Sequence, residues 1–172
     1  MRFVRFAIAI VVGSAVPAAA MTLTSPDIRQ GATISKEQVY TRCGGGNISP
    51  ALSWNGAPAN TKSFAITAID ISVKPHYWSH WIAVDLPPNR MSLAKGAALP
   101  SGAKPVMTDF GDAAYGGPCP PEGSGPHQYV FTVWAMPNAN FQPPANANAE
   151  ELDAALSKAA LAKASITAVY ER

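Results

Sequence analysis

Short runs of β-branched and aromatic residues, some alternating with polar ones, predict a fold built mainly of antiparallel β-strands. The predicted strands cover residues 21–24, 52–54, 62–69, 78–86, 128–136 and 165–170. Successive side chains of a strand point to opposite faces. Alternation therefore places His80 on the face of Ile82 and Val84, and it places His127 on the face of Tyr129.

One helix is predicted between the last two strands. Asn148 is its expected N-cap, with Glu151 as the partner in a capping box. The alanine-rich segment that follows suits a helix of about four turns, with Lys158 and Lys163 near the negative end of its dipole. Residues 89–114 show little periodicity and predict a long loop, which is typical of segments that wrap a site.

The first twenty residues have the pattern of a secretory signal peptide. Arg2 and Arg5 make a basic start, residues 6–12 are apolar, and residues 18–20 are the small residues of a cleavage site. A membrane anchor is the alternative, but the apolar stretch is shorter than the ~20 residues that span a bilayer. Cleavage after Ala20 would leave residues 21–172 as a single exported domain, periplasmic or secreted.

Removal of this signal peptide would also neutralise the chain. The sequence has 13 basic and 11 acidic side chains and a formal net charge of +2, and the signal peptide carries two of the basic ones and none of the acidic ones. The mature chain would then have no net charge and no basic cluster, which argues against nucleic-acid partners and against electrostatic membrane binding. It contains no second long apolar run, so no transmembrane segment is expected in it.

The cysteines predict a cross-link. Cys43 and Cys119 are the only two in the sequence, and an even pair in an exported chain is most simply a disulfide. It would close a loop of about 77 residues and stabilise the fold by about 4 kcal/mol. A catalytic thiolate is the alternative, and it would need one of the two cysteines to be free beside a base.

A segment rich in proline and glycine, residues 116–126, precedes the strand at 128–136. Pro118, Pro120 and Pro121 fix their own φ angles and favour extended geometry in the residues before them. The segment can therefore be neither a helix nor a central strand. We expect a rigid loop that runs over the surface or along the wall of a pocket.

Four polar side chains stand at the ends of predicted strands: Asp70, His80, His127 and Tyr129. Each has a purely structural alternative, since a strand histidine is often a hydrogen-bonded core residue, an aspartate often caps a turn, and a buried tyrosine often donates to a carbonyl. Together they suggest a site in which a carboxylate orients one imidazole and leaves its other nitrogen for a ligand. Two imidazoles and a phenol supply donors for an anion such as phosphate or a carboxylate.

Metal binding and hydrolysis are two more specific alternatives to anion binding at these residues. Asp70, His80 and His127 could supply three metal ligands. His76 and His80 have the zinc-ligand spacing of a helix, but they lack the glutamate of that motif and lie in a strand context. Serine hydrolysis would need a nucleophile elbow, and no Gly-x-Ser-x-Gly occurs, so Ser124 in a Gly-Ser-Gly turn near His127 is the remaining candidate nucleophile.

Several segments, spread over most of the predicted domain, resemble one known family. They are Cys43–Trp54 (Cys-Gly-Gly-Gly-Asn-Ile-Ser-Pro-Ala-Leu-Ser-Trp), Lys62–Ala65 leading to Asp70, Trp78–Trp81 (Trp-Ser-His-Trp), and Tyr115–Tyr129. In this order they resemble the phosphatidylethanolamine-binding protein (PEBP) family, also called Raf kinase inhibitor-like proteins, in its bacterial branch. The resemblance implies a mostly β fold in which a large antiparallel sheet packs against a smaller one, with an anion pocket at one edge.

The resemblance also assigns positions to the pocket, to its rigid wall and to its rim. These positions are Asp70, Trp78, His80, Gly117, Pro120, Pro121, His127 and Tyr129. In the family the pocket takes phosphate, acetate or a phosphorylated head group. The loop after Asp70 departs from the usual Asp-Pro-Asp/Glu-x-Pro, because this chain reads Asp-Ile-Ser-Val-Lys-Pro and has Ser72 in place of the second acid. Kinase inhibition does not carry over, because an exported protein does not meet cytosolic kinases.

These observations predict an exported binding protein for a small anionic or phosphorylated ligand, without a metal or other cofactor. Modulation of a protein partner is compatible with that prediction. Binding is favoured over catalysis because no pair of nucleophile and base stands out in the sequence. The alternatives are a hydrolase that uses a pocket histidine as general base and a protein-interaction or inhibitor module.

Overall fold

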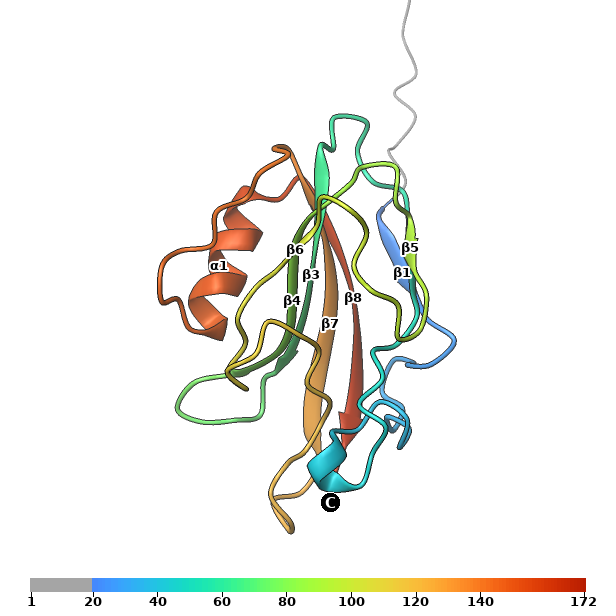
Figure 1. Cartoon of the computed structure of the whole chain (residues 1–172), viewed down its shortest axis with the longest axis vertical. Helices are drawn as coiled ribbons and strands as arrows, with labels where there is room; N and C mark the ends of the chain where they lie inside the picture. Colours follow the sequence, from blue (N-terminus) through green and yellow to red (C-terminus); the bar gives the residue numbers. More distant parts are fainter. Residues whose placement is uncertain (1–19) are drawn as a thin grey trace, which may run out of the picture.

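The computed structural model describes residues 20–172, so the predicted signal peptide lies outside the described residues except for Ala20. Two antiparallel sheets pack face to face, and a helix covers the outer face of the larger sheet (Figure 1). The strands are β1 (Thr22–Thr24), β2 (Leu52–Asn55), β3 (Ser63–Asp70), β4 (Trp78–Leu86), β5 (Ser92–Leu93), β6 (Lys104–Pro105), β7 (His127–Met136) and β8 (Ala162–Tyr170), and the helical elements are η1 (Thr41–Cys43) and α1 (Ala149–Ala159). This architecture confirms the predicted fold class.

The larger sheet has the strand order β6-β4-β3-β7-β8, and the smaller sheet has the order β1-β2-β5. All eight residues of β3 are buried, because the small sheet covers one face of this central strand and α1 covers the other. Between the sheets, the rings of Trp54 and Phe64 pack edge to face at 5.4 Å between centroids. Under the helix, Trp134 and Leu156 belong to a second apolar cluster. The centre of the large sheet is therefore buried on both faces, and the ends of its strands are where a polar site can form. No helix among residues 20–172 is long and apolar enough to cross a bilayer.

The predicted helix exists but is shorter than expected. Its capping box is formed, with Asn148 Oδ1 accepting from the Glu151 N–H at 2.9 Å and Glu151 Oε2 accepting from the Asn148 N–H at 3.1 Å. The helix ends at Ala159, so the placement of Lys163 in its last turn was wrong. Lys163 instead lies in β8 with its Nζ 4.4 Å from the centre of the Trp134 ring. Residues 162–170 pair with β7 over nine register positions, and this part of the chain is therefore a strand of the large sheet.

Alternation along β4 also misplaces one important side chain. The pairing of β4 with β3 is interrupted by a register shift between Ala68 and Ile69, so that Trp81 pairs with Ala68 while Ser79 pairs with Ile69. A β-bulge of this kind puts an extra residue into one strand and re-aims its side chain. The extra residue is His80. Its ring therefore contacts Tyr129 on the inner face of the sheet instead of lying with Ile82 on the helix face, as the alternation had predicted.

Candidate functional site

Three of the predicted site residues meet where β3 ends and β7 begins. Asp70, the last residue of β3, pairs with Tyr129 of β7, and His127 lies two residues before Tyr129. The side chains of His127 and Tyr129 share one face, as predicted, and their rings stack with centroids 6.5 Å apart. Nδ1 of His127 donates a hydrogen bond of 2.6 Å to the Asp70 carboxylate. Because the two side chains are only 3% and 10% exposed, this is a buried pair that fixes the tautomer of the imidazole.

His80 reaches the same place from β4. Its ring packs edge-on against Tyr129 at 5.1 Å between centroids, and its Nδ1 donates to the Gly116 carbonyl at 2.7 Å. Burial lowers the pKa of His80, and the Gly116 hydrogen bond and the Asp70 charge oppose that shift only in part. The ring is therefore neutral at pH 7. With Nδ1 as the donor to Gly116, Nε2 of the neutral ring carries the lone pair.

The ring of Tyr129 packs against both imidazoles. Tyr129 is 1% exposed, and within the described chain its hydroxyl has no hydrogen-bond partner. Burial raises the pKa of Tyr129, and the neighbouring Asp70 carboxylate raises it further, so the phenol keeps its proton. An unpartnered buried hydroxyl costs about 1–3 kcal/mol, which an acceptor atom of a ligand would recover.

Ser124 completes the surroundings of His127. Its Oγ lies 3.1 Å from His127 Nε2 and also donates to the Pro121 carbonyl at 2.7 Å. Ser124, the remaining candidate nucleophile of the sequence analysis, thus lies within hydrogen-bond distance of an imidazole, which the sequence alone did not show. The only signal was the Gly-Ser-Gly turn shortly before the histidine. A turn of this kind is too common to identify a nucleophile by itself.

The proline-rich segment forms a wall that other loops hold in place. The Gly117 N–H donates to Asn47 Oδ1 at 2.7 Å, and Asn47 Nδ2 donates to the Tyr115 carbonyl at 3.2 Å. Two residues further on, a disulfide joins Cys119 to Cys43, the pair proposed from the sequence. The glycine-rich loop that contains Asn47 is thus a clamp on the wall. Asn47 was not predicted as a site residue, because its role depends on a contact with a segment 70 positions away.

The remaining predicted positions line the wall and the rim. Pro120 is buried and its carbonyl accepts from Arg172 Nε at 3.1 Å, whereas Pro121 is exposed. Trp78 is 38% exposed and packs edge-on against Phe110 at 6.0 Å between centroids. Phe110 also packs against His80 at 5.1 Å, and sequence reasoning missed it because it lies in a loop without periodicity. The structure therefore brings the four polar residues together and places the wall and the rim beside them.

Replacing Gly117 by alanine tests the fit of this wall. A Cβ at residue 117 would overlap the Gln38 carbonyl oxygen and lie 2.7 Å from the Tyr40 nitrogen, both of them backbone atoms. We expect Gly117→Ala to lower the free energy of unfolding by about 2–3 kcal/mol, because rigid backbone cannot move aside. Gly102→Ala is the control, since a Cβ there meets nothing within 4 Å and only its φ of +92° adds strain. That strain costs about 1 kcal/mol. Equal losses in the two variants, measured by urea unfolding, would contradict the tight fit.

The altered loop after Asp70 keeps its connection to β7. Asp70 Oδ1 accepts from the Ser72 N–H at 2.8 Å, and Ser72 Oγ accepts from the Gln128 N–H at 2.9 Å. Ser72 thus holds the first residues of β7 in place next to the Asp70 carboxylate. Ser72 stands where the usual family motif has a second acid, and Asp70 is the carboxylate that contacts His127.

Metal ligation finds no support in the geometry. Within residues 20–172, no three His, Cys, Asp or Glu side chains are grouped so that they could hold a metal ion. Asp70, His80 and His127 are therefore not assigned as metal ligands. His76 is exposed in the loop before β4, so it cannot act with buried His80 as a helical zinc pair.

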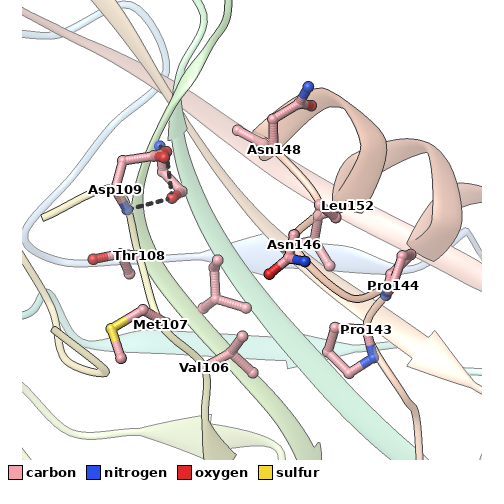
Figure 2. A pocket seen from close by; sticks show the side chains of 13 residues that line it. Val106, Met107, Thr108, Asp109, Pro143, Pro144, Asn146, Asn148 and Leu152 are labelled. Carbon is pink, nitrogen blue, oxygen red and sulfur yellow. Dashed lines mark hydrogen bonds between the residues drawn. The ribbon is translucent and has the colours of Figure 1, made fainter. Parts of the chain in front are cut away.

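A separate cavity of about 320 Å³ lies on the helix face of the large sheet (Figure 2). Its lining includes Val106, Met107, Asp109 and Leu152, and it contains none of the predicted site residues. The Asp109 carboxylate accepts from both the N–H and the hydroxyl of Ser79 at 2.7 Å. Ser79 and His80 therefore point to opposite faces, and the sheet separates this cavity from the histidine cluster.

A large and a small antiparallel sheet form a sandwich, and imidazole and phenol groups lie together where β3, β4 and β7 meet. These two features define the class of protein. The family profile described as phosphatidylethanolamine-binding protein matches residues 24–171. The chain belongs to the phosphatidylethanolamine-binding protein family.

Three relatives show how far the similarity extends. The UPF0098 protein YbcL of Escherichia coli (strain K12) is 38% identical over 163 residues, which cover 90% of this chain and 89% of YbcL. The crystal structure of YbcL, described as a new member of the mammalian PEBP family, has a TM-score of 0.81 at 37% identity and covers 90% of this chain and 99% of the other. The PEBP homologue CT736 from Chlamydia trachomatis has a TM-score of 0.74 at 31% identity, covering 89% and 98% of the two chains. The lipoprotein homologue LppC of Mycobacterium tuberculosis (strain H37Rv) is 33% identical over 151 residues, covering 88% of this chain and 72% of LppC.

Proposed function

We propose that this protein binds small anions, among them phosphoryl groups, between His80 and His127. The observation that carries the proposal is the row of three rings formed by His127, Tyr129 and His80, in which the middle residue, Tyr129, has a buried hydroxyl without a partner within the described chain. A phosphate or carboxylate has several acceptor oxygens, which can accept hydrogen bonds from a phenol hydroxyl and from imidazole N–H groups. The Tyr129 hydroxyl can donate at any physiological pH, whereas His80 can donate from Nε2 only after it gains a proton.

The rigid wall favours binding without reorganisation. Gly117 is held by Asn47, and Cys119 is held by its disulfide, so the wall has the same anchors with or without a ligand. A preformed site loses little conformational entropy on binding. We expect the ligand to be small, because the site is built from closely packed rings.

We further propose that the protein is exported and functions in the periplasm or as a secreted protein. Residues 1–20 have the composition of a signal peptide. The disulfide between Cys43 and Cys119 supports an oxidising compartment, where such bonds persist. The relative LppC is named as a lipoprotein, which is consistent with a location outside the cytoplasm.

Histidine NMR during an anion titration tests the pocket. We expect the imidazole signals of His80 and His127 to shift as phosphate or phosphoethanolamine is added to millimolar concentrations. His76, which is exposed in a loop, is the internal control and should stay unchanged. Tyr129→Phe removes only the hydroxyl and should weaken binding about three- to tenfold. Unchanged His80 and His127 signals would reject the site, and equal shifts of all three histidines would indicate unspecific binding.

A further inference from the structure

Ser124, His127 and Asp70 are arranged as a hydrolytic triad. Ser124 Oγ is 3.1 Å from His127 Nε2, and Nδ1 on the other side of the ring is 2.6 Å from Asp70 Oδ2. Such triads are recognised by geometry and by the role of each group, since their order in the chain differs between folds. We propose that this protein hydrolyses small, reactive carboxylic esters with Ser124 as the nucleophile.

The carboxylate and the imidazole are held in the orientation that the chemistry needs. Asp70 is 2% exposed and its second oxygen accepts from the Ser72 N–H at 2.8 Å, so the carboxylate cannot turn away. Because the carboxylate accepts, Nδ1 of His127 carries a hydrogen, and Nε2 has a lone pair for the serine hydroxyl whenever the ring is neutral. Asp70 is thus a positioning residue, and His127 is the general base.

The serine is accessible to a substrate. Ser124 is exposed, in the turn between the proline wall and β7, while the imidazole behind it is buried. The Pro121 carbonyl, 2.7 Å from Ser124 Oγ, competes with His127 for the single hydroxyl hydrogen. Only the orientation toward Nε2 is reactive, so we expect slow turnover.

One backbone donor stands next to the nucleophile. Within the described chain, the N–H of Gly125, the residue after Ser124, donates to no backbone carbonyl. In other serine hydrolases the N–H that follows the nucleophile contributes to the oxyanion hole. A single donor stabilises a developing oxyanion weakly. This restricts the substrate class to esters with a good leaving group, such as aryl esters, and excludes amides.

The reaction uses water as its only co-reactant. Ser124 Oγ adds to the ester carbonyl while its proton passes to His127 Nε2. The tetrahedral intermediate then expels the alcohol, which takes that proton, and leaves an acyl group on Oγ. Water adds to the acyl carbon, giving a proton to Nε2 that is returned to Oγ as the carboxylic acid leaves. This activity shares His127 with the proposed anion site but does not depend on an anion being bound.

Hydrolysis of 4-nitrophenyl acetate by the purified protein, together with covalent labelling by a fluorophosphonate, tests the triad. We expect release of nitrophenolate that falls about tenfold or more in Ser124→Ala and Asp70→Asn. In Asp70→Asn the loss should lie in kcat and not in KM. Ser101→Ala removes another exposed loop serine and should change nothing. Peptide mass spectrometry should place the label on Ser124.

Two outcomes would overturn the proposal. Equal hydrolysis by the wild type and Ser124→Ala would show that an imidazole reacts directly, and a label on any other residue would exclude Ser124 as the nucleophile. Ser124→Ala alters only an exposed turn, so it is expected to fold. If Ser124→Ala still shows the phosphate-induced shift of His80, a failure of the triad leaves the anion site standing, and the two proposals are separated.

Discussion

Replacing Cys43 and Cys119 together by serine is expected to lower the free energy of unfolding by about 4 kcal/mol. The disulfide joins residues 76 positions apart, and it restricts the unfolded chain far more than a short loop would. In the folded state it ties the proline wall to the end of η1. The variant should therefore also bind phosphate more weakly, because Gly117 and Pro120 flank the lost anchor.

Urea unfolding of four proteins measures this effect. Cys43→Ser, Cys119→Ser and the double variant all break the same bond, so their losses should be equal and not additive. The wild type should contain no free thiol, and its mass should correspond to residues 21–172 if the predicted signal peptide is removed. Two free thiols in the exported wild type, or a double variant as stable as the wild type, would contradict the prediction.

Sulfate should bind more tightly as the pH falls below 7, by up to about tenfold per pH unit for one coupled proton. Neutral His80 presents a lone pair to the anion, whereas protonated His80 donates a hydrogen bond and carries a charge. Burial lowers the pKa of His80 in the free protein, and a bound anion must raise it. The affinity therefore increases as the pH falls from the pKa of the complex to the lower pKa of the free protein.

Sulfate is the suitable probe because its own charge stays constant over this range. Isothermal titration calorimetry compares the wild type with His80→Gln and with His76→Gln. The buffers run from about pH 8 to about pH 5, a range that includes the ordinary pKa of histidine. The glutamine at residue 80 can donate at every pH, so the part of the pH dependence that comes from His80 should disappear. His76→Gln should behave like the wild type, since His76 is exposed in a loop. A His80→Gln profile as steep as that of the wild type would show that another group takes up the proton.

Local sequence patterns predicted the elements whose geometry depends on near neighbours. The capping box of Asn148 and Glu151 lies within one turn of helix, and the shared face of His127 and Tyr129 needs only an extended backbone. The cysteine pair was also predicted, because two cysteines in a chain with the pattern of a signal peptide leave one possible disulfide. The eight site positions came from residue types and from the family resemblance together. Their ligand remains a prediction.

Long-range contacts explain what sequence reasoning missed. His80 turns inward because of a bulge that exists only in the pairing of β4 with β3. Lys163 leaves the helix because β8 pairs with β7, and helical propensity does not compete with a complete strand ladder. Ser124 meets His127 through a turn whose conformation depends on the hydrogen bond to the Pro121 carbonyl.

By itself, the sequence determined the β-rich class, the helix start, the disulfide and the identity of the polar groups at the strand ends. These features follow from local backbone preferences and from residue chemistry, which act over a few positions. Only the tertiary structure decided which groups the ring nitrogens of His80 and His127 contact, which face His80 occupies, and that a serine lies beside His127. Those features depend on strand register and on loops that meet across the fold, where one position of shift changes every contact.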